Sequence, residues 1–116
     1  MSSDVDALIG QLRTFASARN WSKFHSPKNL ACALSVESGE LLESFQWMTD
    51  EQSRNLAPEQ KHEVAMEVAD VLLYLLQLCD QLGIDPLRAA HEKLTVNETR
   101  YPVELSRGSS KKYTEL

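Results

Sequence analysis

The sequence has few of the residues that build turns and cross-links. Its 116 residues include four glycines, four prolines and two cysteines. This leaves little room for a β-fold, in which short strands alternate with tight turns. Cys32 and Cys79 lie inside apolar helical patterns and lack the spacing of a disulfide framework or a metal site. We interpret them as small core residues of a protein in a reducing compartment.

Positive charge and long apolar runs are also scarce. Twelve Lys and Arg stand against 17 Asp and Glu, a net charge of −5, which argues against a nucleic-acid polymer as partner but leaves small phosphate-bearing ligands open if a metal reverses the local charge. The longest apolar segment, residues 68–79, is too short to span a bilayer, and the N-terminus lacks a secretory signal pattern. We therefore expect a cytoplasmic protein that does not bind membranes.

Helical patterns account for most of the chain. The spacing of apolar residues predicts one all-α domain with four helices, over residues 4–19, 27–48, 58–82 and 86–100. Ser3 is a candidate N-cap of the first helix, and Ser26 and Asp85 each precede a proline that suits a first helical position. Pro102 ends the last helix. We expect a four-helix bundle over residues 1–102 and a basic, mobile tail over residues 103–116, although this tail could instead fold over a phosphate group.

The third predicted helix is apolar on nearly every side, so we expect it at the centre of the bundle. It nevertheless carries Glu67 and Asp70, which helical spacing directs toward the core. The second helix repeats this pattern with Glu37 and Glu40. If the two helices pack side by side, four carboxylates converge and repel one another unless a divalent cation is present. Carboxylate ligands favour Mg²⁺, or Mn²⁺, over zinc.

The acids allow two other interpretations. They could be ordinary surface acids, but two pairs with equal spacing and matching phase against the apolar stripe favour a metal site. A di-iron carboxylate bundle needs a Glu-x-x-His motif on each of two helices. Only Glu59 and His62 form such a pair, and they lie at the outer start of their helix. The sequence therefore disfavours the di-iron interpretation.

Aromatic residues gather in the predicted connection over residues 20–25, which contains Trp21, Phe24 and His25. Such rings can close the end of a bundle, or they can form a platform on which a nucleobase stacks, an interaction that contributes about 1–3 kcal/mol per base. The residue types alone do not decide between these two roles. Trp47, near the end of the second helix, is a second candidate for stacking.

The acid pairs are also the basis of a family resemblance. Glu37-Ser-Gly-Glu40 followed by Glu67-Val-Ala-Asp70 resembles the E-x-x-E…E-x-x-D signature of the MazG-like all-α nucleoside triphosphate pyrophosphohydrolases. The similarity is greatest to the dCTP pyrophosphatase branch of that family and covers nearly all of residues 12–116. It rests also on the following segments: Trp21-Ser-Lys-Phe-His25, Phe45-Gln-Trp47, Asp70-Val-Leu-Leu-Tyr74, Lys93 with Asn97, Arg100-Tyr-Pro102 and Ser109-Ser-Lys-Lys-Tyr113.

The resemblance implies Mg²⁺-dependent hydrolysis of a nucleoside triphosphate, dCTP or a modified dCTP, to the monophosphate and pyrophosphate. It further implies a homo-dimer or homo-tetramer with active sites near the subunit interfaces. By position, the implied metal ligands are Glu37, Glu40, Glu67 and Asp70, and Glu37 or Glu40 would also act in catalysis by positioning water. The implied base-binding residues are Trp21, His25 and Trp47, and the implied phosphate or sugar contacts are Tyr74, Lys93 and Asn97. The alternative is a non-catalytic helical bundle that binds a nucleotide or a protein partner.

Overall fold

A computed structural model describes residues 3–116, and every regular element within that range is a helix. The four long helices predicted from the sequence are present, so the all-α prediction is confirmed. In chain order the elements are α1 (Ser3–Ala18), the short 3₁₀-helix η1 (Ser22–Phe24), α2 (Pro27–Glu43), α3 (Asp50–Arg54), α4 (Pro58–Leu82), α5 (Pro86–Arg100), α6 (Val103–Ser106) and η2 (Tyr113–Glu115). None of the helices in residues 3–116 is long and apolar enough to cross a membrane.

The helix ends follow from local chemistry. The Ser26 side chain caps α2 by accepting a hydrogen bond from the Asn29 backbone amide at 3.1 Å. The Asp85 carboxylate caps α5 by accepting from the amides of Leu87 and Arg88, each at 3.1 Å. Gly83 ends α4 in the left-handed region at φ 65°, which glycine adopts without steric cost. The predicted N-cap Ser3 is the first residue of α1, and its side chain lies outside the described part.

Two boundaries differ from the sequence predictions. α2 ends at Glu43 instead of residue 47 or 48, because the chain tightens into i→i+3 hydrogen bonds such as Phe45 N to Leu42 O at 2.9 Å. The connection that follows contains a helix that was not predicted, α3. Its signal was visible in the sequence, since Thr49 and Gln52 form a capping box in which each side chain bonds the other residue's backbone amide.

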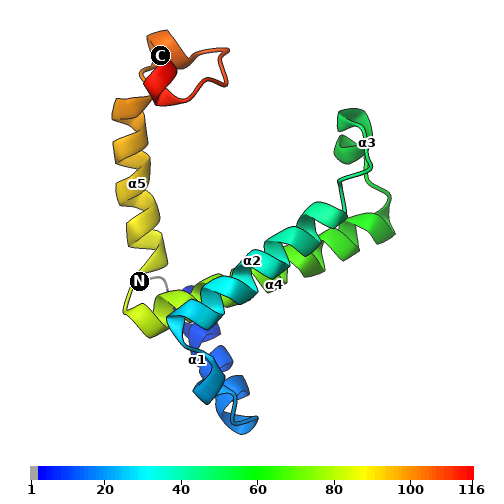
Figure 1. Cartoon of the computed structure of the whole chain (residues 1–116), viewed down its shortest axis with the longest axis vertical. Helices are drawn as coiled ribbons and strands as arrows, with labels where there is room; N and C mark the ends of the chain where they lie inside the picture. The colour runs from blue at the N-terminus through cyan, green and yellow to red at the C-terminus, as the bar shows by residue number, and fades with distance from the viewer. Residues whose placement is uncertain (1–2) are drawn as a thin grey trace.

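The long helices form a body and a projecting arm. α2 runs antiparallel to α4 along most of its length, and α1 packs against the C-terminal half of α4 (Figure 1). α5 makes no comparable packing contact and extends away from the body, with residues 103–116 folded at its far end (Figure 1). The radius of gyration is 17.5 Å, against about 13 Å for a compact domain of this length. The chain alone is therefore an open structure.

Little apolar surface is fully buried in this open arrangement. The buried apolar residues are Ile9, Ala16, Leu30, Leu76 and Cys79. α4, predicted to be central, is covered by α1 and α2 on one side only, and on the other it exposes Val68, Leu72 and Leu75. Contiguous apolar surface of this kind marks an interaction site in soluble proteins.

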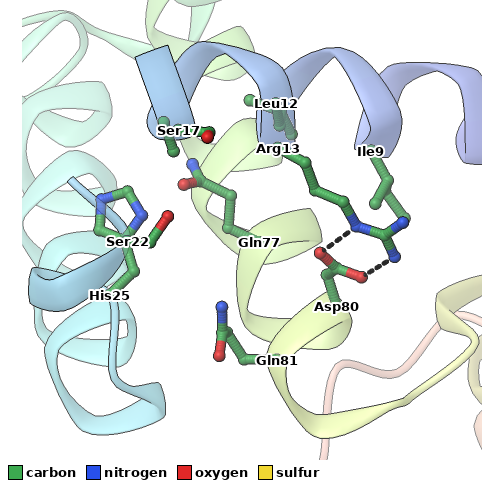
Figure 2. Close-up of a pocket in the computed structure, with 10 residues that line it drawn as sticks. Ile9, Leu12, Arg13, Ser17, Ser22, His25, Gln77, Asp80 and Gln81 are labelled. Carbon is green, nitrogen blue, oxygen red and sulfur yellow. Dashed lines mark hydrogen bonds and ion pairs between the residues drawn. The ribbon is translucent and has the colours of Figure 1, made fainter. Parts of the chain in front are cut away.

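One ion pair ties α1 to α4. The Arg13 guanidinium donates two hydrogen bonds to the Asp80 carboxylate, at 2.9 and 2.5 Å (Figure 2). These hydrogen bonds hold the pKa of Asp80 below its usual value despite partial burial. Because both oxygens are engaged by one planar group, the pair has a defined geometry and restrains α1 against α4 at this point.

We expect Arg13→Met to lower the melting temperature at pH 7. A carboxyl with a depressed pKa stabilises the folded state above its unfolded pKa of about 4, and this contribution is lost as the pH falls through the lower folded value. The difference between variant and parent should therefore be largest at neutral pH and shrink below about pH 4. Arg88→Met, which breaks an exposed Arg88–Glu92 pair within α5, is the control and should change little. Equal losses in both variants would contradict the role of Arg13.

Candidate active site

Acidic side chains from two helices meet where α2 and α4 lie side by side. Glu37 comes from α2, and Glu67 and Asp70 come from successive turns of α4. Each offers a carboxylate oxygen, and these oxygens lie within 4.8 Å of one another. The sequence predicted this juxtaposition from the matching phase of the two acid pairs. Three carboxylates at this separation form a set of hard oxygen ligands for a divalent cation.

Two oxygens of this cluster are buried without a partner. Glu37 Oε2 and Glu67 Oε2 are both inaccessible to solvent and accept no hydrogen bond. An ionised carboxylate can only accept, so neighbouring carboxylates cannot satisfy one another unless a proton is shared. Leaving a charged acceptor without a hydrogen-bond partner is unfavourable. A proton or a cation would therefore stabilise the cluster.

The pKa values of Glu37 and Glu67 also reflect the repulsion among the carboxylates. The pKa of Glu37 is raised to about 7, first because a proton can be shared with the Glu40 carboxylate and second because the group is partly buried. The negative charges of Glu40, Asp70 and Glu67 raise it further. The pKa of Glu67 is also raised, chiefly by burial and then by the charges of its neighbours.

Glu40 and Glu43 form the outer part of the cluster. Glu40 does not join the group of three carboxylates within 4.8 Å, but its charge acts on both Glu37 and Glu67. Glu43 adds to the repulsion on Glu67 and was not among the predicted site residues. Its signal was present in the sequence, because Glu43 continues the three-residue spacing of Glu37 and Glu40 along α2. In the described chain, no Lys or Arg forms an ion pair with any of these acids.

An aromatic pocket of about 250 Å³ adjoins the cluster. Asp70 lines both the pocket and the acid cluster, which places the two side by side. The other lining residues are Leu12 and Phe15 of α1, Trp21 and His25 around η1, and Leu73, Tyr74 and Gln77 of α4. Trp21 packs edge-on against Phe15, with ring centroids 5.7 Å apart. Three of the predicted ligand contacts, Trp21, His25 and Tyr74, are thus brought together.

The remaining predicted contacts lie elsewhere in the chain. Trp47 follows the end of α2 and is 90% exposed, so it does not share the pocket of Trp21 and His25. Lys93 and Asn97 belong to α5, which extends away from α2 and α4 (Figure 1). The fold of one chain does not bring these three residues to the acid cluster, and their roles stay predictions.

Comparison with known proteins places this arrangement in a family. The MazG-like family matches residues 32–116. The dCTP pyrophosphatase 1 of Rattus norvegicus is 46% identical over 104 residues, and that of Homo sapiens is 43% identical over the same length; each alignment covers 88% of this chain and 61% of the relative. A crystal structure of a pyrophosphatase from Archaeoglobus fulgidus superposes with a TM-score of 0.82 and 43% identity, over 88% of this chain and 95% of that one.

The chain therefore belongs to the MazG-like family, as the acid signature predicted. It spans about three-fifths of the length of the dCTP pyrophosphatases that it matches. The fold match to the archaeal pyrophosphatase extends over nearly all of that protein. Within this fold, the donor set of the acid cluster fits a divalent cation, since its buried oxygens lack partners and its carboxylates are mutually repulsive.

We expect the metal-free protein to lose stability as the pH rises from about 4.5 to above 7. The folded pKa of Glu37, about 7, lies above its ordinary value of 4.5, so the folded state holds a proton that it must give up across this window. The raised pKa of Glu67 acts in the same direction, whereas the lowered values of Asp80 and Asp85 affect only more acid conditions. Melting temperatures in a chelating buffer measure this decline.

Added Mg²⁺ or Mn²⁺ should raise the melting temperature more at pH 8 than at pH 5, because metal binding requires the deprotonated acids. Glu37→Gln removes the titrating group and should flatten the metal-free decline. A metal-free melting temperature that increases between pH 5 and pH 8 would contradict the clustering of the acids.

Proposed function

We propose that the protein is a Mg²⁺-dependent nucleoside triphosphate pyrophosphohydrolase that converts dCTP or a modified dCTP to the monophosphate and pyrophosphate, clearing the nucleotide pool. The observation that carries this proposal is the acid cluster, whose partnerless buried oxygens lie beside an aromatic pocket through the shared residue Asp70. The similarity to the dCTP pyrophosphatases of rat and human supports the choice of substrate.

The proposed cation ligands are Glu37, Glu40, Glu67 and Asp70. When bound, Mg²⁺ or Mn²⁺ would neutralise triphosphate charge and lower the pKa of a bound water. In the reaction, a water oxygen forms a bond to the α-phosphorus while the bond from that phosphorus to the bridging oxygen breaks, and pyrophosphate leaves. We assign the positioning of this water, and acceptance of its proton, to Glu37 or Glu40.

The aromatic pocket is the proposed base site. Trp21 offers a ring for stacking, His25 faces the same cavity, and Tyr74 lies one helical turn from Asp70, where the sugar would follow the triphosphate. At about 250 Å³ the pocket is smaller than the roughly 300–1,000 Å³ that holds drug-sized ligands. The pocket has room for a single nucleobase, and the choice of a pyrimidine is supported by the similarity to the dCTP pyrophosphatases.

Residues of a second copy complete the proposed site. The exposed apolar face of α4 is uncovered, and the projecting α5 makes no extensive packing contact with another helix of the described chain. A homo-dimer or homo-tetramer in which α5 packs against another subunit would bury both surfaces. It would also allow Lys93 and Asn97, and Trp47 at the far end of the body, to contact phosphate, sugar and base across the interface.

The proposed location is the cytoplasm. Cys32 and Cys79 are both free thiols, Cys32 exposed and Cys79 buried. An exposed free thiol is typical of a reducing compartment. A cytoplasmic location also suits an enzyme of the nucleotide pool.

Loss of one cluster carboxylate should abolish catalysis without unfolding the chain. We expect Asp70→Asn to lower pyrophosphate release from dCTP in Mg²⁺ by at least about 100-fold, a loss of some 2.7 kcal/mol of transition-state stabilisation. Glu59→Gln is the matched control, because Glu59 is an exposed acid in the first turn of the same helix. Wild-type turnover by Asp70→Asn would place the active site elsewhere. A Mg²⁺-independent nucleotide affinity without turnover would favour the non-catalytic binding bundle.

Mixing two inactive variants should restore activity if subunits share the site. Lys93→Ala removes the proposed phosphate contact from one side of the interface, and Asp70→Asn removes a ligand from the other. In a dimer with two-fold symmetry, random exchange makes half of the assemblies mixed, each with one intact site, so about a quarter of parental activity should return. Pyrophosphate release after co-refolding measures this. A mixture as inactive as its components would contradict a shared site, and an active Lys93→Ala alone would remove Lys93 from it.

A further inference from the structure

A second cavity, of about 220 Å³, lies directly beyond the aromatic pocket between α1, the η1 segment and α4 (Figure 2). Leu12, His25 and Gln77 line both cavities. The second cavity differs from the first in the polar groups that it adds to otherwise apolar walls. They include the hydroxyls of Ser17 and Ser22, the amide of Gln81 and the Arg13–Asp80 ion pair.

The two cavities follow one face of α4. Asp70, Tyr74, Gln77 and Gln81 are spaced by three or four residues, so their side chains lie in a row along the helix. At 1.5 Å per residue, this row extends about 16 Å from the acid cluster to Gln81. In the proposed function, the triphosphate lies at the acid cluster and the base lies in the aromatic pocket. The edge of the base that is remote from the sugar then faces Gln77 and the second cavity.

Gln77 stands at the junction of the two cavities. Its Nε2 donates a hydrogen bond to the Leu73 carbonyl at 3.2 Å, which folds the side chain back along its own helix. Figure 2 shows the amide extending from α4 toward Ser17 of α1, with His25 across the cavity. No other hydrogen bond holds the Gln77 side chain within the described residues. The amide is thus placed to separate the cavities by its volume and is free to turn.

We infer that Gln77 determines specificity as a partition between the base pocket and the second cavity, a lobe with several polar groups that receives a substituent on the outer edge of a pyrimidine. This inference rests on the proposed function. The groups lining the second lobe suit a hydrogen-bonding substituent: Asp80 keeps acceptor capacity beyond its bonds to Arg13, and the hydroxyls and the Gln81 amide both donate and accept. In the parent protein the Gln77 side chain limits the size of group that can pass.

The test compares dCTP with 5-(3-aminoallyl)-dCTP, whose amine can reach the second lobe and donate hydrogen bonds there. We expect Gln77→Ala to raise the ratio of kcat/KM for the substituted nucleotide over dCTP by about tenfold or more, the usual scale for admitting a group into a shaped pocket. Alanine is the best helix former, so this substitution in the interior of α4 is compatible with folding. A ratio within twofold of the parent overturns the partition.

Gln77→Met is the matched control. Methionine has a similar length and fills the same space without the amide, so the ratio should stay within twofold of the parent if volume at the junction decides specificity. A rise in Gln77→Met equal to that in Gln77→Ala would show that the amide and not its bulk matters, and would contradict the partition.

A binding measurement separates this inference from the proposed function. Calorimetric titration with dCMP and 5-(3-aminoallyl)-dCMP requires no turnover, and the affinity ratio should shift in Gln77→Ala as the kinetic ratio does. If no nucleoside triphosphate is hydrolysed but the affinity ratio shifts, the proposed function fails and the partition stands. If dCTP is hydrolysed and neither ratio shifts, the partition alone fails. If neither monophosphate binds at millimolar concentration, the cavities hold no base and the partition is wrong.

Discussion

Repulsion among the carboxylates between α2 and α4 is the constraint on which the site depends. The same two helices form the most extensive contact in the chain, so the apolar packing that holds them together also forces Glu37 and Glu67 into a common, partly buried space. The free energy gained from that packing offsets the electrostatic cost of bringing like charges together. The repulsion remains visible in the raised pKa values of Glu37 and Glu67. A cation bound in the cluster would remove this repulsion, and its positive charge would attract a triphosphate.

The parts of the fold that could be predicted are those determined by near neighbours in the sequence. Proline and cap residues fix the starts of α2 and α5, and the spacing of Glu37 against Leu34 and Leu41 fixes the direction of that carboxylate. The meeting of the acid pairs needed only one further assumption, that consecutive long helices pack side by side. The early end of α2 at Glu43 was not predictable from propensity, because apolar residues 45 and 47 continue the helical pattern past it.

The position of α5 and of its residues could not be predicted from near neighbours in the sequence. Lys93 and Asn97 have the pattern of an ordinary helix flank, and the sequence contains nothing that specifies the neighbour of that flank. Trp47 likewise continues the apolar spacing of the preceding helix, but its side chain is almost entirely exposed. The contacts of such residues depend on surfaces outside their own helix. Local sequence patterns therefore predict the helix that carries them but not what they contact. Gln77 is not predicted as a site residue for another reason. A glutamine has no metal-ligand or acid–base signature, and its spacing with Asp70 and Gln81 is also that of an ordinary polar helix flank.

The link between body and arm consists of Gly83, Ile84 and the cap residue Asp85. α5 has 15 residues and is therefore about 22 Å long, so a small change of backbone angle in this link displaces the far end of α5 by a large distance. A rotation of about 20° at Gly83 would carry the far end of α5 through roughly 8 Å, more than one helical turn of 5.4 Å. The backbone angles of Gly83 thus set the direction of α5 and the position of every side chain on it. A residue without a side chain therefore controls where Lys93 and Asn97 lie.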